Sequence, residues 1–159
     1  MYLRSIIFGI NDSLVSTVGF LAGISVAGVP RETVILTGIV YALVEAFSMA
    51  SGNYLSEESA QEYTERANVN NRPSIISGIF MFFSSFLAAL IPLSPYLFIT
   101  GENALFASAG ISILGLFILG GLTARFSNLP MFWRSVRMAV VGGFSIGLGI
   151  LVGSFFPKL

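Results

Sequence analysis

The sequence predicts an all-α membrane protein built as a bundle of five transmembrane helices. Of its 159 residues, 55% are hydrophobic and only 10% are charged, whereas soluble domains carry about 25% charged residues. The mean hydropathy is +0.86. Five separate stretches each hold roughly 20 mainly apolar residues, the length that a helix needs to cross the hydrocarbon core of a bilayer.

The five stretches are separated by short segments rich in glycine, proline and asparagine, which favour turns. The predicted spans cover residues 5–27, 33–55, 74–97, 103–123 and 136–156. Within the third span, Pro92 and Pro95 are expected to kink or end the helix. No connecting segment is long enough for a second domain. We therefore expect residues 1–159 to form one domain, with residues 56–73 as a short acidic helical extension and loop.

The basic residues predict the orientation, because cytosolic loops carry an excess of lysine and arginine. Six of the eight fall on the side of the N-terminus: Arg4, Arg66, Arg72, Arg125, Arg134 and Arg137. Only Arg31 and Lys158 fall on the other side. A cytosolic N-terminus follows, and Trp133 suits an aromatic belt at the same interface. The first apolar segment contains Asn11 and Asp12, so we expect no cleavable signal peptide, and the small size favours a prokaryotic cell (inner) membrane.

Composition excludes several classes of function. Eight basic residues balance eight acidic ones, so neither the charge nor a basic patch suggests nucleic acid. The chain has no cysteine and no histidine, which removes disulfides, thiolate zinc sites and histidine-ligated haem. We expect no cofactor. We also expect no enzyme, because the one nearby serine, Ser48, has no base except Glu45.

Two acids, Asp12 and Glu45, lie inside predicted spans, where an ionisable group costs several kcal/mol. Asp12 lies roughly 10 Å below the cytosolic surface at 1.5 Å per residue. On the antiparallel second helix, Met49 lies roughly 10 Å from the same surface and Glu45 roughly one turn deeper. The three side chains are therefore expected in one half of the membrane. The structural alternatives are that Asp12 hydrogen-bonds a neighbouring helix and that Met49 only packs.

Carboxylates beside a thioether suit a borderline divalent transition ion better than Mg²⁺, which prefers oxygen alone. Two carboxylates also neutralise one divalent charge in a medium of low dielectric. On the second helix, a carboxylate and a thioether belong to one stripe of side chains. The members of this stripe are three or four residues apart, so they lie on one face of the helix. The stripe consists of Tyr41, Glu45, Met49, Asn53 and Ser56.

The acidic extension carries Glu58, Glu62 and Glu65 on one helical face, at i, i+4 and i+7. This face is either a solvated helix end or a funnel that raises the local cation concentration at the mouth of a pathway. As a funnel, it would bind the metal ion first.

Small residues suggest close helix packing. Gly143-x-x-x-Gly147 and Gly149-x-x-x-Gly153 lie in the fifth span, and this spacing lets helix backbones approach closely. The spacing fits either packing within the chain or the seam of a dimer. In the first span, glycines at 19 and 23 are expected to admit another backbone.

Four segments together resemble the vacuolar iron transporter family, which includes yeast-type vacuolar iron/manganese carriers and plant nodulin-like members. "FGINDSLVSTVGFLAGIS" resembles the first helix of the family, and "EAFSMASGNYLSEESAQE" resembles the second. "LIPLSPYLF" resembles the exit of the third helix, and "FWRSVRMAVVGG" precedes a fitting glycine-rich fifth helix. The resemblance covers nearly the whole chain.

The resemblance implies a homodimer whose first helices line a metal path along the two-fold axis. It implies export of Fe²⁺ or Mn²⁺ from the cytosol, often in exchange for protons. By position, Asp12 matches the metal and proton carboxylate of the first helix and Met49 matches the thioether ligand of the second. The chain departs from plant members at Tyr41 and Asn53, where those members carry glutamate. It also lacks most of their glutamate-rich insertion between the second and third helices.

The leading hypothesis is therefore a homodimeric exporter of Fe²⁺ or Mn²⁺, for which the resemblance alone implies proton antiport. The Glu58/Glu62/Glu65 face collects the ion, Asp12, Met49 and Glu45 pass it on, and Asp12 exchanges the proton. An unpaired carboxylate in low dielectric accepts a proton when the metal leaves, because its charge is costly there. The alternatives are a non-transporting membrane scaffold or sensor with buried structural carboxylates, and a passive cation channel.

Overall fold

The computed structural model describes residues 2–65, 71–126 and 130–156, and these residues form five α-helices. The helices are α1 (Tyr2–Val26), α2 (Arg31–Glu65), α3 (Arg72–Phe98), α4 (Glu102–Phe126) and α5 (Met131–Ser154). Each is long and apolar enough to cross a membrane. The protein is thus an all-helical, multi-pass integral membrane protein.

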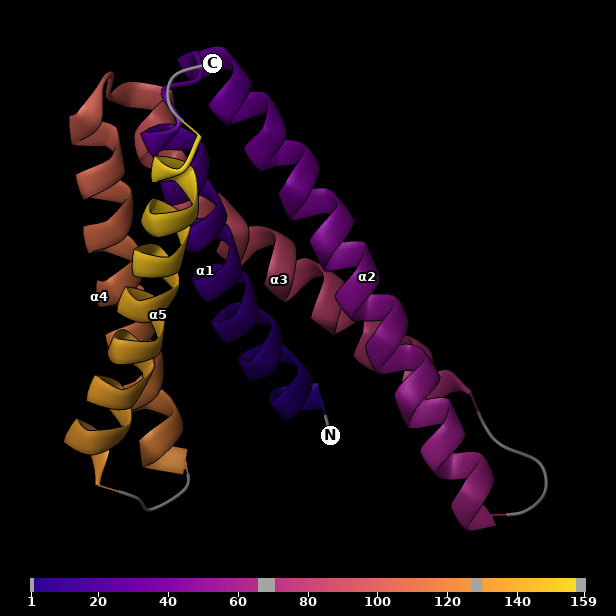
Figure 1. Ribbon diagram of the computed structural model, residues 1–159. Helices are drawn as coiled ribbons and strands as arrows, with labels where there is room; N and C mark the ends of the chain where they lie inside the picture. Colours follow the sequence, from indigo (N-terminus) through magenta and orange to yellow (C-terminus); the bar gives the residue numbers. More distant parts are fainter. Residues whose placement is uncertain (1, 66–70, 127–129, 157–159) are drawn as a thin grey trace.

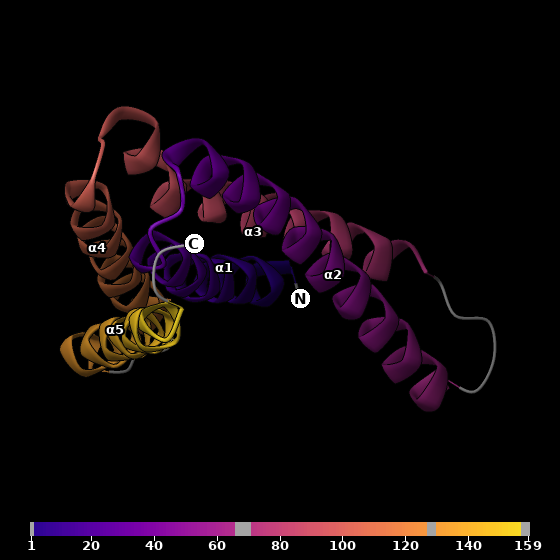
Figure 2. The same cartoon turned by 45° about the horizontal axis from the view of Figure 1, so that its top comes forward.

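The helices form two pairs that flank α1 (Figure 1). α2 packs along α3 on one side of α1, and α4 packs along α5 on the other. Figure 2 shows the same two pairs diverging from each other. Within the described residues, α2 touches α1 and α3 but neither α4 nor α5. The bundle therefore depends on α1, which contacts all four other helices.

Successive helices run in opposite directions through the bundle (Figure 1). The start of α1, the end of α2, the start of α3, the end of α4 and the start of α5 lie at one end, and the short α1–α2 and α3–α4 connections lie at the other. We call the first the arginine-rich end, since it carries Arg4, Arg72, Arg125, Arg134 and Arg137. Arg66 and Lys158 lie outside the described residues.

Apolar side chains cover the outside, as a lipid-facing surface requires. Phe47, Phe106 and Phe144 are 68%, 70% and 69% exposed. The interior combines apolar side chains such as Leu21 and Leu116, each 0% exposed, with small hydroxyl side chains, including Ser13, Ser77, Ser85 and Ser108, also 0% exposed. Small polar residues at helix contacts permit close approach and hydrogen bonds between helices. Trp133, 71% exposed near the arginine-rich end, has the exposure of an interfacial belt residue.

The two glycine pairs of α1 and α5 pack against each other. A Cβ added at Gly23 would lie 3.1 Å from the Gly149 carbonyl oxygen, and one added at Gly153 would lie 3.0 Å from the Gly23 carbonyl carbon. A Cβ at Gly19 would meet Ser145 of α5. Gly149 and Gly153 therefore serve packing within the chain. By contrast, a Cβ at Gly143 or Gly147 would meet nothing within 4 Å.

The observed helices lengthen the predicted spans. α2 continues to Glu65, as the acidic extension predicted, and α5 begins at Met131, directly after Pro130. Pro92 and Pro95 lie inside α3, which continues to Phe98. Pro95 cannot donate to the carbonyl of Ile91, and the Ser94 hydroxyl donates to that oxygen at 2.8 Å instead.

Arg31 begins α2 at the end opposite the arginine-rich end, and its guanidinium caps α3. Its Nε donates to the Tyr96 carbonyl at 2.7 Å, and its Nη2 donates to the Leu97 carbonyl at 2.5 Å. The last carbonyls of a helix lack intrahelical partners and attract cations. This cap explains why a basic residue lies at the end opposite the arginine-rich end.

Candidate functional site

α1 and α2 bring the predicted site residues to one level. The Ser13 hydroxyl donates to Met49 Sδ at 3.8 Å, and the Ser16 hydroxyl donates to Glu45 Oε1. Asp12 is adjacent to Ser13 and one turn from Ser16 on the same helix. The antiparallel register therefore places Asp12, Glu45 and Met49 within the same turns of the bundle, which is the register that the sequence predicts.

Glu45 is half-buried and only partly satisfied. Its Oε1 accepts hydrogen bonds from Ser16 and from Tyr41, whose hydroxyl lies at 3.2 Å. Phe20 of α1 holds the Tyr41 ring by stacking, with centroids 4.4 Å apart. Glu45 Oε2 is buried, and among the described residues the buried Thr17 hydroxyl is close enough to the Glu45 carboxyl group to interact with it, without a hydrogen bond of good geometry. Buried polar atoms usually have partners, so this oxygen is free to take a proton or a cation.

Asp12 lies half-buried on α1, near enough to Glu45 for their charges to interact. Among the described residues, no hydrogen bond reaches its carboxylate; only its backbone carbonyl accepts one, from Ser16 at 2.8 Å. A carboxylate that serves as a structural link would be expected to bond a neighbouring helix. The Asp12 side chain makes no such link to any residue that the structure describes.

Met49 is anchored from two helices. Its sulfur accepts weak hydrogen bonds from Ser13 of α1 and from Ser85 of α3, the latter at 3.5 Å. These contacts hold the thioether at the junction of α1, α2 and α3. A sulfur fixed in this way is available as a soft ligand.

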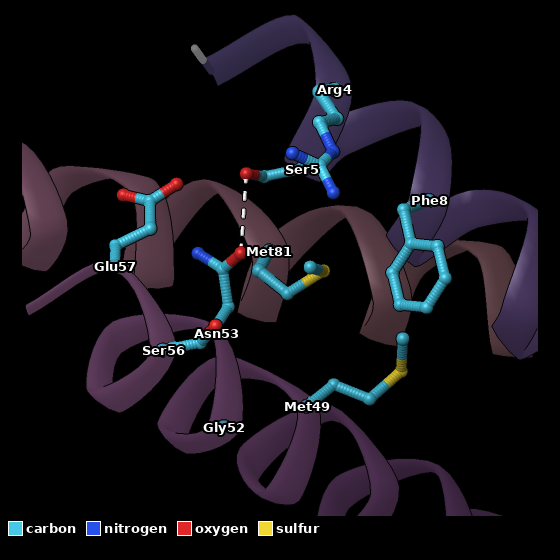
Figure 3. Close-up of a pocket in the computed structure, with 9 residues that line it drawn as sticks. All are labelled: Arg4, Ser5, Phe8, Met49, Gly52, Asn53, Ser56, Glu57 and Met81. Atoms are coloured by element: carbon cyan, nitrogen blue, oxygen red, sulfur yellow. Dashed lines mark hydrogen bonds between the residues drawn. The ribbon is translucent and has the colours of Figure 1, made fainter. Parts of the chain in front are cut away.

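A cavity of about 390 Å³ opens between these helices on the side of Met49 toward the arginine-rich end (Figure 3). Its lining includes Met49, Asn53 and Glu57 of α2, Ser5 of α1 and Met81 of α3. Ser77 of α3 ties the polar part together. It accepts from Asn53 Nδ2 at 2.8 Å and donates to Glu57 Oε1 at 2.9 Å, and its hydroxyl lies 2.8 Å from that of Ser5.

The predicted stripe on α2 is present, but its last half-buried member is Glu57 and not Ser56. Tyr41, Glu45, Met49 and Asn53 are half-buried against the neighbouring helices, and Ser56 is exposed. The next inward residue is Glu57, one turn beyond Asn53. Glu57 lies just beyond the predicted span 33–55 and is not among the site residues that the sequence predicts. A strict four-residue spacing from position 41 to position 57 was the signal that could have found it.

Glu58 and Glu62 of the acidic extension do not share one environment. Glu58 Oε1 accepts from the Tyr54 hydroxyl at 2.8 Å and from Asn71 Nδ2 at 2.7 Å, so it ties α2 to the start of α3. Glu62 is exposed. The backbone of Glu65 ends α2, but its side chain lies outside the described residues. A role for Glu58, Glu62 and Glu65 in metal collection stays a prediction.

The described part of one chain does not contain a complete multi-carboxylate metal centre. It holds no group of three or more aspartate, glutamate, histidine or cysteine residues placed to share an ion. An ion beside Asp12, Glu45 and Met49 would need further ligands. Water or a second copy of the chain could supply them.

These features define a multi-pass membrane protein with unpaired carboxylates and a fixed thioether inside its spans. Comparison with known proteins then identifies the family. A model of the VIT family matches residues 3–75 and 65–154, which together are nearly the whole chain. The chain belongs to the VIT family, as the resemblance of its helices indicated.

Curated relatives agree with this family. The chain is 22% identical to vacuolar iron transporter 1 of Oryza sativa subsp. japonica, over 88% of this chain and 79% of the rice protein. It is 27% identical to vacuolar iron transporter homolog 1 of Arabidopsis thaliana, over 96% of this chain and 84% of that protein. Vacuolar iron transporter homolog 3 of the same plant is 28% identical, over 99% and 82%. Proteins of this family are transporters and not enzymes.

Proposed function

We propose that the protein exports Fe²⁺ or Mn²⁺ from the cytosol, with protons moving in the opposite direction. The observation that carries the proposal is that α1 and α2 hold the Asp12 carboxylate, the incompletely bonded Glu45 carboxylate and the Met49 sulfur at one level. Two carboxylates balance a divalent charge, and the thioether favours a transition ion over Mg²⁺. The metal is the substrate and not a resident cofactor.

The scaffold or sensor alternative is less well supported. A structural carboxylate inside a membrane should satisfy both oxygens, because unsatisfied polar groups there are costly. Glu45 satisfies one oxygen, and within the described ranges its other oxygen is buried without a hydrogen bond of good geometry. The names of the curated relatives, which include iron transporters, also favour transport.

Tyr41 supports the idea that Glu45 replaces the glutamate of the plant members. Tyr41 occupies the position of that glutamate in the resemblance, and its hydroxyl donates to Glu45 Oε1 at 3.2 Å. One turn of helix therefore separates the former carboxylate position from the present one. We assign Glu45 as a metal ligand and Tyr41 as the residue that positions it.

A homodimer completes the proposed site. Two copies of Asp12, Glu45 and Met49 around a two-fold axis would supply the ligands that one chain lacks. The arginine-rich end is assigned to the cytosol by the excess of basic residues, and we take the prokaryotic cell membrane as host. When the metal leaves, Asp12 accepts a proton because an unpaired charge in low dielectric is costly. Each metal ion that leaves the cytosol then allows protons to move in the opposite direction.

The short cytosolic connection distinguishes this chain from its rice relative. The rice alignment spans 200 residues but covers only 88% of the 159 residues here, so the rice protein carries internal residues that this chain lacks. The two ranges matched by the VIT family overlap at residues 65–75, around the connection between α2 and α3. This supports our interpretation of residues 56–73 as a reduced acidic extension on a single domain.

The test is Mn²⁺ flux into proteoliposomes under a pH gradient. The parent chain should accumulate Mn²⁺ above empty liposomes, and Glu45→Gln should lose most of that flux because the carboxylate charge is gone. Glu32→Gln is the matched control, since Glu32 is exposed at the opposite end of the same helix. Parent flux no greater than that of empty liposomes would refute transport, and flux that ignores the pH gradient would refute proton exchange.

A further inference from the structure

We propose that the cavity between α1, α2 and α3 is a transit site that holds the metal ion before it reaches Met49, with Glu57, Asn53 and Met81 as ligands. The inference rests on the proposed function, because it adds an earlier stop on the same route. None of these three residues belongs to the site that the sequence predicts. The argument rests on hydrogen-bond capacity, ligand chemistry and spacing along α2.

Counting hydroxyl protons shows which oxygens in the cavity remain open. Ser77 has one hydroxyl proton, which it donates to Glu57 Oε1 at 2.9 Å. Glu57 Oε2 is buried and has no hydrogen-bond partner in the described ranges 2–65, 71–126 and 130–156. Asn53 donates its amide to Ser77. Ser5 then uses its one proton for Ser77 at 2.8 Å, so Asn53 Oδ1 keeps only a long contact of 3.4 Å with the Ser5 hydroxyl (Figure 3). Glu57 Oε2 and Asn53 Oδ1 therefore have spare lone pairs in one cavity.

Two sulfurs line the same cavity as these oxygens. Met49 enters from α2 and Met81 enters from α3, and both line it together with Glu57 (Figure 3). Met81 is 3% exposed, so its position is fixed by packing. Thioethers beside one carboxylate and one carboxamide form a donor set suited to Fe²⁺, Mn²⁺ or softer ions. A volume of about 390 Å³ leaves space for an ion that keeps some of its waters.

The spacing along α2 makes the cavity part of a continuous route. Glu57, Asn53, Met49 and Glu45 follow one another at four-residue intervals, so each step is roughly 6 Å along the helix. Glu57 lies nearest the arginine-rich end and Glu45 lies deepest. An ion that entered at Glu57 could therefore exchange ligands step by step until it reached the level of Asp12.

The charged side chains that line the cavity favour weak, short-lived binding of a divalent cation. Glu57 is its only carboxylate, and Arg4, which is exposed, also lines it. A single carboxylate near a guanidinium binds a divalent cation weakly. Conduction requires sites that are favourable enough to enter and weak enough to leave.

The experiment measures the concentration dependence of Mn²⁺ uptake by the full chain in proteoliposomes. Glu57→Gln should raise the KM for Mn²⁺ about tenfold, as loss of a group that supports a metal site does, and should leave the maximal rate near that of the parent. Glu102→Gln, at the exposed start of α4 on the opposite end, should leave both values unchanged. An unchanged KM for Glu57→Gln would overturn the proposal.

Met81 supplies a second variant with an independent readout. Met81→Leu keeps the apolar volume and removes the sulfur, so competition of Cd²⁺ against Mn²⁺ uptake should weaken while competition by Mg²⁺ stays constant. Met131→Leu is the matched control, because Met131 is 59% exposed at the start of α5. Equal loss of Cd²⁺ and Mg²⁺ competition, or no loss of either, would count against a thioether ligand.

Direct binding separates this inference from the proposed function. Mn²⁺ binding to the purified parent and to Glu57→Gln, followed by the electron paramagnetic resonance signal of free Mn²⁺, requires no transport. A parent that binds Mn²⁺ through Glu57 but does not move it would refute the exporter and keep the cavity as a metal site. A parent that transports Mn²⁺ with identical binding in Glu57→Gln would refute the transit site alone.

Discussion

Gly149→Ala tests the packing of α5 on α1, the most extensive of the contacts that join the α4–α5 pair to the other helices. A Cβ at Gly149 would lie 2.9 Å from the Gly19 carbonyl carbon and 3.2 Å from the Gly23 backbone nitrogen. These are backbone atoms, so they can retreat only if the helices separate. Overpacking of this kind costs about 1–3 kcal/mol, and the backbone clash favours the upper part of that range.

The assay is thermal unfolding of the purified protein in detergent, and Gly147→Ala is the matched control. Gly147 lies on the same helix, and its added Cβ would meet nothing within 4 Å. The control should be as stable as the parent or more so, because alanine favours a helix over glycine by up to about 1 kcal/mol. Equal melting temperatures for Gly149→Ala and Gly147→Ala would refute the proposed contact.

Two further predictions concern hydrogen bonds. Arg31→Ala removes the two bonds to the last carbonyls of α3, so it should lower the free energy of unfolding by about 1–3 kcal/mol, measured by the same thermal assay. Exposed Arg137, replaced by alanine, is its control, and equal stability of the two variants would contradict the cap. Tyr41→Phe keeps the stacking on Phe20 but removes the donor to Glu45. It should reduce Mn²⁺ flux without changing the melting temperature, and full flux would show that Tyr41 does not position Glu45.

The number of helices and their approximate limits could be predicted because hydrophobic length is a local property. The start of α5 was missed by five residues, since Met131–Ser135 contains Trp133 and Arg134, which read as interface and not as helix. The interior prolines were expected to kink or end α3. The helix continues past both, because the hydroxyl of Ser94 satisfies a carbonyl that a proline leaves free. Such compensation depends on side-chain geometry, which hydropathy does not contain.

Helix register could be predicted from the sequence, and with it the common level of the candidate site residues. The contacts that α3 makes with α2 could not be predicted. Counting residues along antiparallel helices predicts that Asp12, Glu45 and Met49 share one level, and the Ser13–Met49 and Ser16–Glu45 hydrogen bonds agree with that register. Their role as a metal site stays a prediction. Glu57 was missed because a glutamate near a helix end reads as solvated. Only the positions of Ser77 and Met81 on α3 show that it lines a cavity. The glycine pairs likewise showed close packing without identifying the partner.

The most direct measurement of the central claim compares Mn²⁺ and Fe²⁺ uptake by Asp12→Asn and by the parent in proteoliposomes. Asparagine keeps the size and hydrogen-bond capacity of the side chain but removes its charge. We predict that this variant folds as the parent does and transports neither ion at a significant rate. Uptake by Asp12→Asn as fast as that of the parent would contradict the claim that metal ions cross the membrane through these carboxylates.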